Sequence, residues 1–81
     1  MSAYHFSKTE QEISEVKSAV HKALQTDEAQ SIKLPRAKVE RILDAHEWYV
    51  YAEALNDDKV TLYCYPYDEG DQTLITLNCE N

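Results

Sequence analysis

Five of the chain's six tyrosines occupy alternate positions in two neighbouring segments. Tyr49 and Tyr51 lie in the first segment, and Tyr63, Tyr65 and Tyr67 lie in the second. If both segments are strands, this spacing puts the five rings on one face of a sheet. Tyrosine combines a large rigid body with a hydrogen-bonding tip, which suits a wet protein interface. The pattern therefore predicts a binding surface that another protein covers.

Acidic residues flank the second tyrosine segment at both ends. Asp57 and Asp58 precede it, and Asp68, Glu69 and Asp71 follow it. A strand of eight residues would separate the two groups by about 25 Å. Carboxylates at both ends of an aromatic face can imitate nucleic-acid phosphates and steer association with a basic partner. The alternative is that these residues only form turns and keep a small protein soluble.

The charge is unevenly distributed along the chain. The formal net charge is −7, and the hydrophobic share of 43% is that of a folded protein. Residues 1–43 carry seven Lys/Arg against six Asp/Glu, a net of +1, whereas residues 44–81 carry one Lys against nine Asp/Glu, a net of −8. Because the tyrosines lie in the acidic half, we do not expect direct nucleic-acid binding. The four basic residues at positions 33–41 lie beside Glu40 and Asp44 and are typical of a solvated helix face.

The side chains that most often carry catalysis or bind metals are scattered. His5, His21 and His46 stand at no metal-ligand spacing. Cys64 lies between tyrosines with no basic neighbour, so it is a poor nucleophile, and we expect Cys64 and Cys79 to be free buried thiols. The chain has a single glycine, whereas the loops that bind phosphates need several. The sequence therefore predicts no enzyme, no cofactor and no metal site.

Two helices are expected in the first half of the chain. Ser7 and Glu10 have the spacing of a capping box, and Pro35 suits the first position of a second helix. We expect helices at about 8–25 and 35–46, joined by a connection with a short extended piece at 31–34. Their apolar stripes contain Ile13, Val16, Val20, Leu24, Val39, Ile42 and Leu43.

In the second half the period of the apolar residues changes to two, which indicates strands. We expect strands at about 48–55, 59–67 and 72–79, with turns at 56–58 and 69–70. The predicted register pairs Tyr49 with Tyr65, Tyr51 with Tyr63, Leu62 with Leu77 and Cys64 with Ile75. In an alternative reading, 47–55 continues the second helix and leaves only a hairpin.

Together these elements predict one α+β domain over residues 1–81, with a flexible lead at 1–6. Two N-terminal helices pack on one face of a three-stranded antiparallel β-meander, in the order α-α-β-β-β. The tyrosines and Leu74 lie on the opposite face. The core face of the sheet comprises Trp48, Val50, Leu62, Cys64, Ile75 and Leu77, and it packs against the two helix stripes.

This organisation predicts a small acidic binding module that inhibits or regulates a partner, namely a basic nucleic-acid-handling protein. In size, acidity and lack of enzyme motifs the chain is similar in type to phage counter-defence proteins such as anti-CRISPR proteins, to immunity proteins and to DNA mimics. No family motif carries that similarity. The alternative is a structural homodimer or accessory subunit that self-associates through the tyrosines. In the simplest reading, the tyrosines only stabilise the strands.

The expected location is the cytoplasm, without membrane contact. The N-terminus lacks the basic start and apolar stretch of a signal peptide, and no apolar run approaches the roughly 18 residues of a membrane span.

Overall fold

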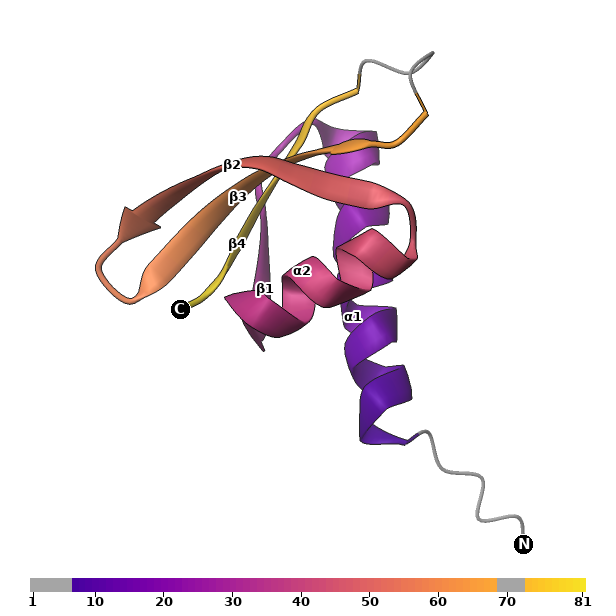
Figure 1. The fold of residues 1–81 in the computed structure, drawn as a ribbon. Coiled ribbons are helices and arrows are strands. Elements are labelled where there is room, and N and C mark those ends of the chain that lie inside the picture. The colour runs from indigo at the N-terminus through magenta and orange to yellow at the C-terminus, as the bar shows by residue number, and fades with distance from the viewer. Residues whose placement is uncertain (1–6, 69–72) are drawn as a thin grey trace, which may run out of the picture.

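The computed structural model describes residues 7–68 and 73–81, which form two helices and a four-stranded mixed sheet (Figure 1). The predicted α+β class is therefore confirmed, whereas the all-antiparallel three-stranded sheet is wrong. The strand order is β1-β4-β3-β2. The elements are α1 (Lys8–Thr26), β1 (Gln30–Pro35), α2 (Arg36–Ala45), β2 (Trp48–Asn56), β3 (Lys59–Pro66) and β4 (Ile75–Glu80).

The additional strand is β1, which changes the element order to α-β-α-β-β-β. It runs parallel to β4, with Gln30 opposite Leu77. Its side chains alternate, so that Ile32 and Leu34 are buried in the core. Locally the segment shows only an extended piece before a proline. Its pairing partner lies more than forty residues further along, and no local pattern reports such a distant contact.

The helix starts follow the capping chemistry of the sequence. The Ser7 side chain accepts a hydrogen bond from the Glu10 backbone N–H at 3.1 Å, and Glu10 Oε1 accepts one from the Ser7 N–H at 2.9 Å. This capping box satisfies two helix-terminal donors. Asp27 ends α1 in the left-handed conformation, and α2 begins directly after Pro35. The predicted helix positions are thus confirmed, and the reading of 47–55 as helix is wrong.

The predicted register is confirmed only in part, because β2 carries a bulge and the turn after it has two residues instead of the three predicted at 56–58. Tyr49 pairs with Tyr65, Leu62 with Leu77 and Cys64 with Ile75, as predicted. Tyr51 does not pair with Tyr63, because Ala52 takes that position and Tyr51 is an extra residue in β2. Such a bulge reverses the alternation of side chains beyond it. Glu53 and Leu55 therefore share the helix-covered face with Leu62 and Val60, although simple alternation puts them with the tyrosines.

Both helices cover one face of the sheet and enclose a single core. It contains Val16, Ala19, Ala23, Ile32, Leu34, Val39, Leu43, Val60, Leu62, Cys64, Ile75, Leu77 and Cys79. Both cysteines are free thiols in this core, as expected. Several residues predicted for the core remain partly open instead, namely Ile13, Val20, Leu24, Ile42, Trp48 and Val50. The predicted flexible lead at 1–6 and the turn at 69–70 lie outside the described residues.

Candidate protein-binding face

The five tyrosines form a continuous row of ring contacts on the face of the sheet opposite the helices. We call this row the tyrosine ladder. Its order is Tyr67, Tyr49, Tyr65, Tyr51 and Tyr63, with ring-centroid distances of 5.5, 4.4, 5.4 and 6.2 Å between successive members. All four pairs are tilted or edge-on, which are the arrangements that aromatic rings prefer. Although Tyr51 is the extra residue of the bulge, its ring still contacts those of Tyr63 and Tyr65.

The ladder is held in place and yet open to solvent. Tyr49, Tyr51 and Tyr67 keep 38%, 53% and 44% of their surface exposed, while Tyr63 and Tyr65 are half-buried between neighbouring strands. The exposed Leu74 was predicted for the same surface. Each ring is therefore restrained by its neighbours and still presents apolar area outward. Large apolar groups that remain exposed together commonly mark a contact site.

The strands beneath the centre of the ladder carry no charged residues. Residues 60–66 and 75–79, which form most of β3 and β4, include no Asp, Glu, Lys or Arg. Across these two strands, the Thr61 hydroxyl donates a hydrogen bond to Asn78 Oδ1 at 2.7 Å. The centres of protein interfaces are likewise depleted in charged residues.

One end of the ladder is tied to the C-terminal end of α2. The Tyr67 hydroxyl donates a hydrogen bond to Asp44 Oδ1, and the Tyr67 backbone N–H donates one to the Glu47 carbonyl at 2.9 Å. The bond to Asp44 raises the pKa of the Tyr67 phenol, because the carboxylate stabilises the protonated form. Tyr67 therefore keeps its proton and a defined orientation.

Acidic side chains lie near both ends of β3. Asp57 and Asp58 are exposed in the two-residue turn between β2 and β3, and Asp57 has a positive φ of 57°, as tight hairpin turns require. Asp68 is exposed just beyond the other end of β3. The predicted site residues Glu69 and Asp71 lie outside the described residues. Figure 1 shows the β2–β3 turn at one end of the sheet and the C-terminal end of β3 at the other.

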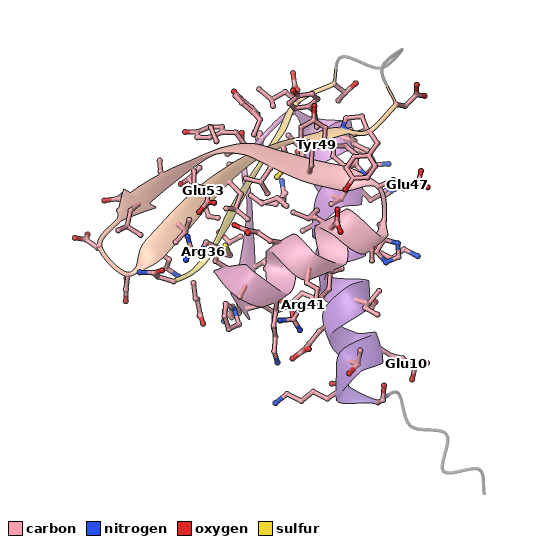
Figure 2. The ribbon with its side chains drawn as sticks, in the orientation of Figure 1. Glu10, Arg36, Arg41, Glu47, Tyr49 and Glu53 are labelled. Atoms are coloured by element: carbon pink, nitrogen blue, oxygen red, sulfur yellow. The ribbon has the colours of Figure 1, made fainter. Side chains whose placement is uncertain are left out.

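A second polar cluster, which the sequence reasoning missed, lies on the helix side of β2 (Figure 2). Arg36 Nη1 of α2 donates to Glu53 Oε1 at 2.8 Å, and this bond lowers the pKa of Glu53. Burial raises the pKa of the neighbouring Glu40. Glu40 Oε2 is shielded from solvent and, among residues 7–68 and 73–81, has no hydrogen-bond donor unless a proton is shared with Glu53. This cluster forms because the bulge in β2 turns Glu53 from the tyrosine face towards α2.

Within the described part of the chain, no three His, Cys, Asp or Glu side chains come together as a metal site would require. Neither of the helices is long and apolar enough to cross a membrane, within the same part of the chain. No known protein family, no curated protein and no solved structure matches this sequence.

Proposed function

We propose that the protein is a small acidic binding module that covers the nucleic-acid-binding surface of a basic partner protein and thereby inhibits or regulates it. The observation that carries the proposal is the tyrosine ladder, a restrained aromatic surface without a charged residue at its centre. We propose a cytoplasmic location, which the two unpaired buried thiols support.

The ladder suits an anchoring role because its rings are already ordered by one another. Binding normally costs about 0.5–1.5 kcal/mol for each flexible side chain that becomes immobilised. A ring such as Tyr65, which contacts Tyr49 and Tyr51, has already lost most of that freedom in the free protein. Tyrosines at the centre of an interface are also frequent hot spots.

The acidic residues supply a reason for the partner to be basic. Asp57 and Asp58 stand at one end of β3 and Asp68 at the other, about 25 Å apart for a strand of eight residues. That length corresponds to about seven phosphate steps along one nucleic-acid strand, at 3.4 Å each. Residues 44–81 carry a net charge of −8 and would accelerate encounter with a cationic groove.

The test needs a variant that removes the anchor and a matched one that does not. Immobilised wild-type protein and Tyr51→Ala would be exposed to nuclease-treated host extract and eluted with a salt gradient, with Leu55→Ala as control. Leu55 is 69% exposed but lies on the other face of the sheet. We expect a basic nucleic-acid-binding protein to be retained by wild type and Leu55→Ala and to be lost with Tyr51→Ala.

The purified partner would then be mixed with a labelled DNA or RNA ligand, and displacement would be followed by fluorescence anisotropy. We expect wild-type protein to displace the nucleic acid, and less efficiently as salt increases. A partner that binds equally well to Tyr51→Ala would disprove the role of the ladder. A partner that keeps its nucleic acid would disprove the inhibitory role.

A further inference from the structure

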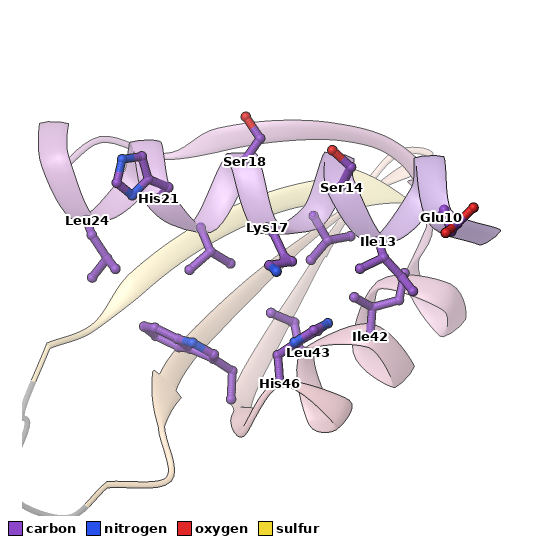
Figure 3. A pocket seen from close by; sticks show the side chains of 13 residues that line it. Glu10, Ile13, Ser14, Lys17, Ser18, His21, Leu24, Ile42, Leu43 and His46 are labelled. Atoms are coloured by element: carbon purple, nitrogen blue, oxygen red, sulfur yellow. The ribbon is translucent and has the colours of Figure 1, made fainter. Parts of the chain in front are cut away.

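An apolar groove lies between α1 and α2 (Figure 3). Its volume is about 840 Å³, and Ile13, Lys17 and Leu24 point into it from α1. Nothing in the described residues shows what covers this groove. The outer edge of β2 is different, because the backbone groups of an edge strand are a template for one kind of partner, another extended chain.

Within residues 7–68 and 73–81, one edge of β2 has no strand beside it. The order β1-β4-β3-β2 places β3 on the other edge, and no backbone hydrogen bond joins residues 48–56 to any described segment except β3. The strand is also open to solvent. None of its nine residues is fully buried, whereas the neighbouring β3 buries Val60, Leu62 and Cys64.

The hydrogen-bond pattern shows which backbone groups of β2 point away from β3. In an antiparallel pair, bonded residues alternate with residues whose N–H and C=O point outward. Glu47 is a bonded position, because its carbonyl accepts from the Tyr67 N–H. Asn56 is another, because the two-residue turn closes on it. Alternation from both ends, with the bulge between, gives the outward positions Trp48, Val50, Glu53 and Leu55.

The two edges of the sheet differ in how well they resist further pairing. β1 has six residues, includes Lys33 and ends at Pro35, and short edges with lysine and proline discourage an added strand. β2 has nine residues without proline, lysine or arginine. Its bulge does not prevent pairing, since β3 pairs with β2 on both sides of it. The β2 edge is therefore the one that can accept another strand.

Charge selects the chemistry of that strand. Residues 47–58 contain Glu47, Glu53, Asp57 and Asp58 and no Lys or Arg, a net of −4. Arg36 pairs with Glu53 near the middle, and the other three acids lie at the two ends. A second copy of β2 would set acid beside acid whichever way it ran, and like charges across neighbouring strands repel. A foreign segment with basic side chains is attracted instead.

We propose that β2 binds an extended segment of the partner protein as a fifth strand of the sheet, with basic side chains of that segment beside the acidic ends of β2. The proposal rests on the proposed function in taking the partner to be basic, and it names the element of the partner that is bound. Backbone hydrogen bonds would supply affinity, as in other cases of strand addition. The added strand would lie beside Tyr49 and Tyr51, so its side chains on that face would continue the tyrosine ladder.

A selection from a phage-displayed library of random peptides tests the edge without any host protein. Peptides of about twelve residues are long enough, because the nine residues of β2 span about 31 Å. We expect the selected peptides to carry Lys or Arg towards both ends. In amide hydrogen exchange followed by NMR, the outward amides of Val50 and Leu55 should exchange fast in the free protein. A saturating selected peptide should slow them at least about tenfold, whereas the inward amide of Ala54 should be slow throughout.

Leu55→Pro is the variant that blocks the edge, and Leu55→Ala is its matched control. Proline removes the outward N–H of residue 55, which is the orientation in which an edge strand tolerates it. Alanine removes the same exposed side chain and keeps the N–H. In anisotropy titrations with a labelled selected peptide, Leu55→Pro should weaken binding at least about tenfold and Leu55→Ala less than about threefold. Circular dichroism would show whether Leu55→Pro is folded; if it is not, the exchange of the wild-type amides decides alone.

Several outcomes would overturn the proposal. The library could yield no binder, or the selected peptides could bind Leu55→Pro as well as Leu55→Ala and leave the outward amides unprotected. Outward amides that are slow in the free protein would mean that another segment covers the edge. Protection that increases with protein concentration would assign the edge to a second copy.

The outcome is separable from that of the proposed function. If selected peptides protect the edge but wild type retains no basic protein from host extract, the edge binds strands and the proposed function fails. If a basic protein is retained and then lost with Tyr51→Ala while the outward amides stay unprotected in its complex, the proposed function stands and strand addition fails.

Discussion

Replacement of Tyr51 by alanine should cost little stability, because Tyr51 is 53% exposed. Full burial of a large apolar side chain contributes about 1.5–3 kcal/mol, so about half of that, near 1 kcal/mol, is at stake here. Ring contacts with Tyr63 and Tyr65 add about 0.2–1 kcal/mol each. We therefore expect the free energy of unfolding to fall by about 1.4–3 kcal/mol, from a total of roughly 4–12 kcal/mol for a domain of this length.

Urea unfolding is the appropriate assay, followed by circular dichroism and by the fluorescence of the single tryptophan, Trp48. Both signals should give the same midpoint if unfolding is two-state. Leu55→Ala is the matched control, because it removes another exposed apolar side chain from β2 that makes no ring contact. Surface substitutions of this kind usually change stability by less than about 0.5 kcal/mol.

A loss well above about 3 kcal/mol for Tyr51→Ala would refute the reasoning. Such a loss is typical of truncation in a packed core, and it would mean that the ladder is a structural element. Any loss of binding by the same variant could then be caused by unfolding. A loss of at most about 3 kcal/mol together with lost binding would instead separate the two roles and assign the ladder to recognition.

Three other properties can be checked with the same equipment. Burial raises the thiol pKa to about 12 for Cys64 and about 11 for Cys79. Both thiols should therefore react slowly with iodoacetamide until the protein is unfolded. Fast labelling of either cysteine in the folded protein would contradict their burial in the core. Burial also raises the pKa of Glu40 above its ordinary 4.5, so its ionised form costs stability once the pH exceeds the raised value, and Glu40→Gln should raise the unfolding midpoint at neutral pH. That gain should disappear below pH 4.5, where the Glu40 carboxyl of the wild type is protonated in both the folded and the unfolded chain. A gain that does not depend on pH would show that the charge of Glu40 is not its cause. Glu47 has a positive φ of 66°, a conformation that favours glycine. Glu47→Gly should therefore stabilise the protein by about 0.5–1 kcal/mol. A destabilised variant would show that contacts of the Glu47 side chain contribute more to stability than the relief of its backbone strain.

Local chemistry explains why so much of the secondary structure can be read from the sequence. The capping box at Ser7, the proline at position 35 and the period-two pattern of β3 each act over a few residues. The pairing of Leu62 with Leu77 also follows from the sequence, because opposed residues must share a face and only one register puts apolar residues together.

The candidate sites depended more on tertiary structure. The tyrosines could be assigned to one face from their spacing alone, and their rings do lie together in the structure. The cluster of Arg36, Glu40 and Glu53 could not be found in this way, because an uninterrupted alternation puts Glu53 on the opposite face. One extra residue at Tyr51 reverses that alternation, and a bulge of this kind leaves no clear mark in the sequence.

The sequence by itself determined the helices, three of the four strands, the tyrosine face and the uneven charge, because these rest on local propensity and on side-chain periodicity. Tertiary structure decided that β1 joins the sheet beside β4, where Ile32 and Leu34 complete the core. It also decided that the apolar stripe of α1 is only partly covered, since the angle between two helices depends on the whole sheet beneath them. The groove between α1 and α2 follows from that packing and from no short segment of the chain.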